Sequence, residues 1–586
     1  MRTRPARRRT VKHLLGLAVG AACAAGTVIG AVGAIAAPRS DAVSREGTIA
    51  ALAPAPYTDW PSYAGGPERR FFNAAEQQID AGNAGALTVK WSFPTGAIIT
   101  SSPASTAIDP PAERGVRVAF FQSWDGNVYA VRLRDGRELW RFATEQRAGV
   151  TFPSTASVHV ERVDGAPRVL VGSGQTFYAL DATNGAELWR FDAGTACASA
   201  EGCGFAAERN EIESSAIVAG GLVLFGMDVN DDEGGKGGFY ALDLRDGRLR
   251  WFFDLESGMT CTPDPTDDVR RYDGYHSEAE LGLPAGFLAT RAGCNHPRSR
   301  NGCGNVWSSP AYDAGRGRVF FASSNCDTDG NPATLKPAPP MPPYDEALVA
   351  LDLDGHPVWR WRAREVDNDD LAYGAAPNLF SATIGGVARD VVGIGNKDGT
   401  YTVLDRDGIN EISGVAWNGP DASALPYWRT KVVAGGAAGG VLATAAVDDD
   451  ADRVYFGTAP GSYADVLSPQ RPTVHALDAA TGAILWQNTG EANADATFAP
   501  TSALPGVVFA GSIVGGFLRA YDAASGVKLG SVQVGVALAA APAVADGTLL
   551  VGGGIGARSA NPNDSSNQSS RIPHALRALC APGTPA

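Results

Sequence analysis

Short apolar runs separated by polar turns recur along most of the chain, and their hydrophobic positions alternate with a period close to two. Eight of these runs are rich in β-branched and aromatic residues: VAFFQS (118–123), RVLVGS (168–173), LVLFGM (222–227), RVFFAS (318–323), VVGIGN (391–396), RVYFGT (453–458), VVFAGS (507–512) and TLLVGG (548–553). Alternation with period two predicts half-buried strands, whereas an amphipathic helix repeats its apolar positions every three or four residues. The pattern therefore predicts an all-β protein.

A sequence unit with the skeleton aromatic-x-A-L-D-x-x-x-G-x-x-x-W follows these runs. It is complete at 128–142, 177–191, 239–253 and 474–487, weaker at 348–361, 401–408 and 518–530, and degraded at 574–583. The D-x-x-x-G tract predicts a turn, and the tryptophan predicts a wedge between neighbouring repeats. Radially repeated antiparallel sheets are typical of propellers. We predict an eight-bladed β-propeller of four-stranded antiparallel blades, with the ring closed by an N-terminal strand at 87–96.

The N-terminal 36 residues have the pattern of an export signal. An apolar Ala/Gly/Leu/Val run and a small-residue A-x-A site at 34–36 follow a basic start made of Arg2, Arg4, Arg7, Arg8, Arg9 and Lys12. Such a segment predicts a signal peptide over 1–36, with an uncleaved membrane anchor as the alternative. We expect a flexible linker over 37–56, the propeller over 57–586, and a secreted, periplasmic or extracytoplasmic cell-surface location.

The chain is acidic, with a formal net charge of −14. Removal of the basic leader would make the remainder more negative still. An acidic body argues against nucleic acids and anionic lipid surfaces as partners. We therefore expect no nucleic-acid partner, and contact with a membrane only through the alternative N-terminal anchor.

Seven cysteines follow the predicted leader, and export favours their pairing. In the segment 303–326 a hairpin turn over 313–316 would place Tyr312 opposite Gly317, and Cys303 would then face Cys326. The other predicted pairs are Cys197–Cys203 and Cys261–Cys294, which leaves Cys580 over. The sequence has no C-x-x-C-H motif, so we predict no covalently attached haem.

An acidic tract between predicted strands is a candidate cation site. The tract VNDDEGGKGG (229–238) crowds Asp231, Asp232 and Glu233 before several glycines. Carboxylate oxygens suit Ca²⁺, and glycines let the backbone approach a ligand closely. The alternative is an ordinary solvated hairpin tip.

Two further polar tracts lie at similar positions between predicted strands. The tract REVDNDDLAYG (364–374) holds Asp367, Asp369 and Asp370, and GNKDG (395–399) holds Lys397. A charged loop and an exposed lysine are the plain alternatives for these two tracts. The Gly-rich tract at 435–440 precedes a predicted strand, so a dinucleotide phosphate site is not expected there. The histidines show no ligand spacing, and we expect them at surface or turn positions.

Several segments together resemble the quinoprotein alcohol dehydrogenases, and within them the polyvinyl-alcohol-dehydrogenase-like propellers. The resemblance runs from about Asp59 to the C-terminus. It rests on the repeat and on the tracts NVWSSP and SSN within 303–326, GAAPNLF (374–380) and GNKDGTYTVLDRDG (395–408). It implies an eight-bladed propeller that holds pyrroloquinoline quinone (PQQ) over a calcium ion, or sometimes a lanthanide ion.

The resemblance also implies roles for individual residues. Trp307 would form the floor on which the quinone stacks, and Lys397 would lie beside the quinone oxygens. The implied metal ligands are Glu233, Asn325, which would also contact the cofactor, and Asp370. Asp370 would act as the catalytic base, with Asp369 as the alternative if the loop is shifted.

Two positions depart from the family pattern. Ala372 stands where the D-x-D-F-G-like tract has its second aspartate, and the vicinal Cys-Cys pair of many members is absent. The leading hypothesis is an exported PQQ- and Ca²⁺-dependent dehydrogenase that oxidises a small or polymeric alcohol and passes electrons to an external acceptor such as a cytochrome c. The alternatives are a non-catalytic binding or assembly scaffold, and a degenerate quinoprotein that binds the cofactor without turnover.

Overall fold

The computed structural model describes residues 59–582 with gaps, all within the unit Leu52–Pro585. The gaps are 111–112, 146–151, 194–210, 229–236, 257, 263–303 apart from 279 and 285, 325–343, 365–366, 368, 417–423, 438, 460–471, 489–495, 514, 536 and 556–573. No helix among the described residues is long and apolar enough to cross a membrane.

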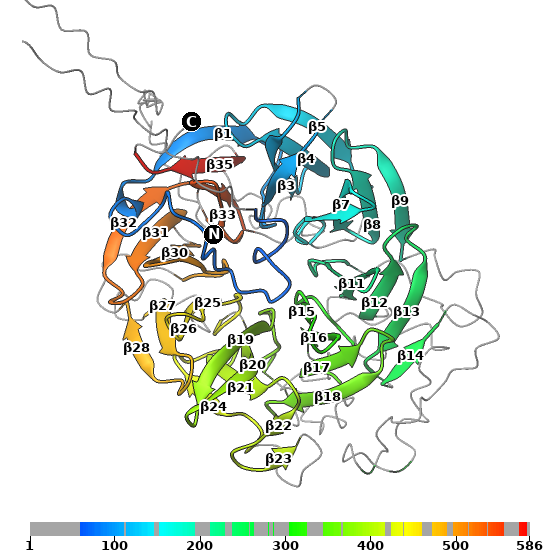
Figure 1. Ribbon diagram of the computed structural model, residues 1–586, viewed down its shortest axis with the longest axis vertical. Helices are drawn as coiled ribbons and strands as arrows, with labels where there is room; N and C mark the ends of the chain where they lie inside the picture. The colour runs from blue at the N-terminus through cyan, green and yellow to red at the C-terminus, as the bar shows by residue number, and fades with distance from the viewer. Residues whose placement is uncertain are drawn as a thin grey trace, which may run out of the picture. The chain divides into compact units, whose positions relative to one another are not determined.

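Eight antiparallel sheets are arranged radially around an axis, as the prediction of an eight-bladed propeller required (Figure 1). Each sheet has four strands except the third, which has five. From the axis outward, the first sheet contains β2 (Ala104–Ile108), β3 (Val116–Ser123), β4 (Asn127–Arg132) and β5 (Glu138–Ala143), and the second contains β6 (His159–Val163), β7 (Ala166–Ser173), β8 (Thr176–Asp181) and β9 (Glu187–Asp192). The third sheet contains β10 (Ile217–Ala219), β11 (Leu222–Met227), β12 (Gly238–Asp243), β13 (Leu249–Asp254) and β14 (Met259–Cys261). The fourth sheet contains β15 (Ala311–Asp313), β16 (Arg318–Ala322), β17 (Ala347–Asp352) and β18 (Pro357–Arg362).

The remaining four sheets continue the ring. The fifth sheet contains β19 (Asn378–Ile384), β20 (Val387–Gly395), β21 (Thr400–Asp405) and β24 (Trp428–Lys431), and the sixth contains β25 (Ala446–Asp448), β26 (Arg453–Gly457), β27 (Val474–Asp478) and β28 (Ile484–Gln487). The seventh sheet contains β29 (Ser502–Leu504), β30 (Val507–Gly511), β31 (Phe517–Asp522) and β32 (Lys528–Gln533). The eighth sheet contains β33 (Ala543–Ala545), β34 (Thr548–Gly552), β35 (Ala575–Cys580) and β1 (Thr88–Pro94). In this last sheet β1 pairs antiparallel with β35 from the other end of the chain. A small hairpin of β22 (Ile409–Asn410) and β23 (Val415–Ala416) follows β21.

The tryptophan and the glycine of the repeat meet across neighbouring blades. The indole of Trp140 in β5 packs on Gly185 of the next blade, where an added Cβ would come within 2.7 Å of the ring, and its Nε1 donates to the Ala182 carbonyl at 2.9 Å. Seven outer-strand tryptophans make this contact: Trp91, Trp140, Trp189, Trp251, Trp359, Trp428 and Trp486. The predicted tryptophan wedge is therefore confirmed, and it explains why the repeat keeps both residues.

The eighth interface replaces the tryptophan with a backbone contact. Gly530 in β32 occupies the tryptophan position of the repeat, and an added Cβ would lie 2.3 Å from the Gly85 carbonyl oxygen. Gly85 belongs to the short 3₁₀-helix η1 (Ala84–Ala86), which packs on β32. The chain leading to β1 thus enters at the one interface where the indole is missing.

An axial segment, defined here as residues 60–73, lies inside the ring of sheets (Figure 1). Its backbone and side chains bond to the innermost strand of every blade, or to the residues just before it. The eight partners are Ser105, Val160, Ser215 with Ala216, Tyr312, Leu379, Val447, Ala503 and Val544. Since each of the eight blades has a backbone group bonded to this segment, one stretch of chain connects all of them.

Arg69 is one of the fully buried side chains of the axial segment. It is 0% exposed, and its guanidinium donates to the carbonyls of Pro310, Tyr63, Ser215 and Ala216 at 2.6–3.1 Å. Burial lowers the pKa of Arg69 to about 10. The five guanidinium N–H groups suit a site that offers several carbonyl acceptors.

The predicted register of the 303–326 hairpin is wrong. Tyr312 pairs with Val319 rather than Gly317, because the loop covers 314–317. The Asp313 carboxylate accepts the Arg316 N–H at 3.0 Å, and Gly317 closes the turn with φ +62°. Glycine adopts such a conformation without the steric cost of a Cβ. Cys303 and Cys326 lie outside the described residues, so their pairing stays a prediction.

Candidate functional site

The candidate site is built around the indole of Trp307, which precedes β15 and is partly exposed. The six-membered ring of the indole lies against Gly374 in the chain leading to β19. A Cβ added at Gly374 would come within 2.2 Å of Trp307 Cη2. Glycine is therefore required there for the backbone to approach the indole so closely.

A lysine and an aspartate approach the same indole. Lys397, in the turn between β20 and β21, has its Nζ 5.8 Å from the centroid of the Trp307 ring. The same ammonium donates to Asp370 Oδ1 at 2.7 Å. The Lys397 side chain is 11% exposed and that of Asp370 is 45% exposed. The ammonium is thus held within the site, while the carboxylate remains open to a reactant.

The loop carrying Asp370 has a constrained backbone. Asp370 has φ +52°, in the left-handed region that non-glycine residues rarely adopt. The buried carboxylate of Asp367 accepts the N–H groups of Asp369 and Leu371, at 3.0 and 2.5 Å. Asp369 itself is exposed, and the ion pair to Lys397 is made by Asp370. Of the two candidate bases, the geometry favours Asp370.

The turn carrying Lys397 rests on the Gly-rich tract. The Lys397 carbonyl accepts the Gly436 N–H at 3.0 Å, and an added Cβ at Gly440 would lie 2.1 Å from that carbonyl oxygen. The Lys397 N–H faces the Ala372 carbonyl at 3.4 Å. The Gly-rich tract therefore lets the chain pack closely beneath the lysine.

Other predicted site residues lie outside the described part of the chain. These are Glu233, Asn325, Cys197, Cys203 and Cys294, together with Cys303 and Cys326. Cys261 is described and buried, at the end of β14. Cys580 is buried in β35, where it pairs in register with Thr88 and Thr548. The proposed metal ligands among these residues and the cysteine pairs stay predictions.

The residues that the structure brings together suit a flat, anionic ligand. An indole face offers stacking, an ammonium at its surface offers charge, and a half-exposed carboxylate offers a proton acceptor. Sequence reasoning found Trp307, Lys397 and Asp370 but missed Gly374 and Gly440. Gly374 lies four residues after Asp370 and Gly440 belongs to the Gly-rich tract 435–440, but the sequence does not say what these glycines touch.

Comparison with known proteins agrees with this architecture. Residues 60–426 match the model of the family described as PQQ: glucose/ethanol/alcohol dehydrogenase, beta-propeller domain. A polyvinylalcohol dehydrogenase from a Pseudomonas species is 24% identical over 537 residues, which covers 84% of this chain and 66% of the relative. A quinate/shikimate dehydrogenase (quinone) from Acinetobacter baylyi is 26% identical over 365 residues, 57% of this chain and 41% of the relative. The chain thus spans two thirds or less of the length of the curated relatives that it matches.

Solved structures share the fold at low sequence identity. The quinohemoprotein alcohol dehydrogenase from Comamonas testosteroni superposes with a TM-score of 0.64 at 19% identity, covering 90% of this chain and 81% of the other. A europium-containing methanol dehydrogenase gives a TM-score of 0.65 at 15% identity, with coverages of 89% and 98%. With the family model covering more than half of its length, this chain belongs to the PQQ glucose/ethanol/alcohol dehydrogenase β-propeller family.

Proposed function

We propose that this protein is an exported quinoprotein dehydrogenase that oxidises an alcohol to a carbonyl compound. The observation that carries the proposal is the Lys397 ammonium, held both over the Trp307 ring and against Asp370. Membership of the PQQ family supports the cofactor, and the similarity to polyvinylalcohol dehydrogenases supports a small or polymeric alcohol as substrate.

The described residues would hold the cofactor in distinct ways. The Trp307 indole would support the flat ring system, and the Lys397 ammonium would bind its anionic oxygens. Bound PQQ with its metal ion supplies an electrophilic carbonyl that accepts hydride from the alcohol. We propose Ca²⁺ as that ion, or a lanthanide, with Glu233, Asn325 and Asp370 as ligands.

Asp370 is the proposed base for the reaction. A carboxylate with one oxygen paired to Lys397 and a half-exposed side chain has room to accept the alcohol proton. As the hydroxyl proton moves from oxygen to the carboxylate, the carbon that bears the hydroxyl would give up a hydride, so the alcohol loses two electrons and two protons and becomes a carbonyl compound. Lys397 would stabilise the negative charge that develops on the carbonyl oxygen of the group that accepts the hydride.

The electrons would pass to an external acceptor such as a cytochrome c. The absence of a C-x-x-C-H motif supports a separate acceptor rather than a haem attached to this chain. The basic and apolar leader supports export, by cleavage of 1–36 or by an anchor.

Reconstitution tests the proposal. The purified protein is incubated with PQQ and Ca²⁺, and dye-linked oxidation is measured with primary alcohols, secondary alcohols and poly(vinyl alcohol). We expect saturable PQQ binding and oxidation of at least one alcohol class. No PQQ binding would refute the proposal and favour a scaffold, whereas binding without turnover on any alcohol would favour a degenerate quinoprotein.

A further inference from the structure

A single arginine lies behind the Lys397–Asp370 pair. Arg364 follows β18 of the fourth blade, and its guanidinium reaches the fifth blade. Its Nη2 donates to Asn396 Oδ1 at 3.1 Å and to Asp398 Oδ2 at 2.8 Å. Its Nη1 donates to the Leu371 carbonyl at 3.0 Å. The side chain is only 18% exposed, so these bonds form largely away from water.

The three acceptors adjoin the two reactive residues in sequence. Leu371 directly follows Asp370, and Asn396 and Asp398 flank Lys397. A second bond joins the same two segments, because Asn396 Nδ2 donates to the Leu371 carbonyl at 2.8 Å. One guanidinium therefore links the backbone that carries the aspartate to the turn that carries the lysine.

The backbone at Asp370 needs such support. Its φ of +52° lies in a region that costs free energy for a residue with a Cβ. Asp367 holds the N–H of Leu371 and Arg364 holds its carbonyl, so the residue after Asp370 is fixed on both sides. The left-handed conformation is thus imposed by neighbours.

The charges around Arg364 also point to a fixed position. Its Nη1 pairs with the carboxylate of Glu346, whose side chain is 0% exposed, and its Nη2 pairs with Asp398. A guanidinium between two carboxylates and two neutral oxygens uses several N–H groups in one plane. Lysine keeps the charge but lacks that planar arrangement of donors.

We propose that Arg364 is a positioning residue that sets the geometry of the Lys397–Asp370 pair from behind the site. The effect on catalysis rests on the proposed dehydrogenase function, whereas the effect on the loop does not. Arg364 contacts neither the indole of Trp307 nor the reactive oxygens of Asp370 in any of its described bonds. It acts through the backbone of Leu371 and the side chains beside Lys397.

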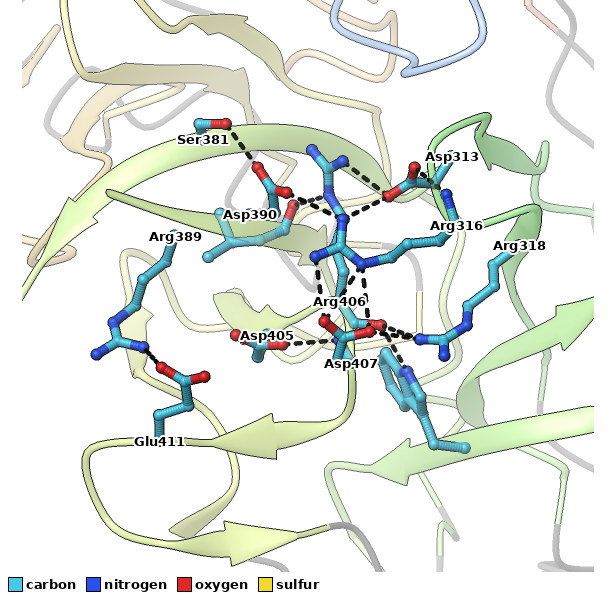
Figure 2. A network of polar contacts seen from close by, with 12 residues as sticks. Asp313, Arg316, Arg318, Ser381, Arg389, Asp390, Asp405, Arg406, Asp407 and Glu411 are labelled. Carbon is cyan, nitrogen blue, oxygen red and sulfur yellow. Dashed lines mark hydrogen bonds and ion pairs between the residues drawn. The ribbon is translucent and has the colours of Figure 1, made fainter. Parts of the chain in front are cut away.

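The chain offers a matched control at the other end of the same two blades. Arg316, in the turn between β15 and β16, pairs with Asp390 at 2.9 Å and with Asp407 at 3.1 Å (Figure 2). It too joins the fourth blade to the fifth through several carboxylates. The turn that carries Arg316 lies at the opposite ends of the strands from the site. Arg316→Lys therefore tests the effect of weakening the contact between the two blades away from the site.

The experiment compares Arg364→Lys and Arg316→Lys with the wild-type protein in three measurements. Hydrogen exchange of peptides covering 369–374 and 396–399 is followed without cofactor. PQQ affinity is measured by quenching of tryptophan fluorescence, and kcat and KM are measured with an alcohol that the wild type oxidises. If Arg364→Lys does not fold, Asp398→Asn, which weakens the hold on the guanidinium, replaces it.

We expect Arg364→Lys to speed exchange in both peptides by about tenfold, because bonds to a charged group are lost. It should also weaken PQQ binding and lower kcat by about tenfold or more with a smaller change in KM. Arg316→Lys should leave all three within about twofold. Wild-type exchange in Arg364→Lys, or equal effects of both variants, would overturn the proposal. If Arg364→Lys exchanges faster but the wild-type protein binds no PQQ, the dehydrogenase function is refuted and the positioning role of Arg364 is not.

Discussion

The Nζ of Lys397 lies 2.7 Å from Oδ1 of Asp370 and at the same time 5.8 Å from the centroid of the Trp307 ring. The three side chains come from separate stretches of the fourth and fifth blades. Because one ammonium lies close to both the indole and the carboxylate, a change in any of the three should affect the other two.

Replacing Asp370 by asparagine should abolish most of the catalysis while preserving the fold. The amide keeps the size of the side chain but cannot accept the alcohol proton, so kcat should fall by about 10²–10⁴. The matched control is Asp369→Asn, since Asp369 is the exposed neighbour. Steady-state kinetics on both variants decide the point. A larger loss in the control would assign the base to Asp369, and equal losses would contradict the assignment to Asp370 alone.

Replacing Trp307 should affect cofactor binding in proportion to the aromatic surface that remains. Trp307→Phe keeps a ring for stacking, whereas Trp307→Ala removes it, so we expect the Kd for PQQ to rise by about tenfold in the alanine variant and less in the phenylalanine variant. Calorimetric titration measures both. Trp140→Phe, at an interblade contact, should lower the melting temperature but leave the Kd unchanged. An unaltered Kd in Trp307→Ala would contradict stacking on this indole.

A methyl group at Gly374 should displace the indole of Trp307. The new Cβ would meet Trp307 Cη2 at 2.2 Å, a distance that requires the indole or the backbone to move. We expect Gly374→Ala to weaken PQQ binding by at least fivefold, on the order of 1 kcal/mol. Gly66→Ala provides the comparison, because its Cβ would find its nearest neighbour at 3.5 Å. Identical affinities in the two variants would show that the close contact is unimportant.

The buried histidine His475 should make stability depend on pH. It is 0% exposed, bonded to Thr458 and Gln487 at 2.8 Å, and burial lowers its pKa to about 3. The unfolded chain binds a proton near pH 6.5, so the stabilisation is fully present above that pH and is lost as the pH falls toward 3. We expect this group to contribute a slope of about 1.4 kcal/mol per pH unit in that window.

Urea unfolding between pH 4 and 7 measures this slope. The His475→Gln variant should be less stable at pH 7 but should lose less stability on acidification than the wild type. Parallel curves for the two proteins would mean that His475 is not the group responsible.

The buried guanidinium of Arg69 should contribute strongly to stability. Arg69→Lys leaves one or more of the carbonyls of Pro310, Ser215 and Ala216 without a donor, which should lower the free energy of unfolding by about 2–4 kcal/mol. Arg248→Lys, at a side chain that is 83% exposed, should change it by less than about 0.5 kcal/mol. Chemical denaturation compares them. A loss below about 1 kcal/mol at Arg69 would contradict this role.

The repeat made the blades predictable from sequence. Contacts that occur only once in the structure could not be predicted in this way. In five blades the tryptophan lies four residues after the repeat glycine, so one pattern reported five of the seven tryptophan interfaces. Arg69 and His475 carry no such pattern. The prediction of a surface or turn position for His475 is wrong, because this histidine lies inside β27, where its two ring nitrogens bond to Thr458 and Gln487.

The site was predictable only in part for a related reason. The resemblance pointed to Trp307 and Lys397, but it left Asp369 and Asp370 open, because the choice depends on the backbone turn at Asp370. That turn is set by Asp367 and Arg364, which hold it through backbone groups of Asp369 and Leu371. A bond to a backbone group leaves no trace in the side-chain sequence.

The axial segment has a consequence for how this protein can evolve. Rings of repeats can change size when one unit is duplicated or deleted. Here residues 60–73 bond to the inner strand of each of the eight blades or to the residues just before it, so a ninth unit would meet no partner and a lost unit would leave a bond unmade. The segment therefore fits a ring of eight blades and no other number. Variation is expected in the loops between blades, while the number of blades stays fixed.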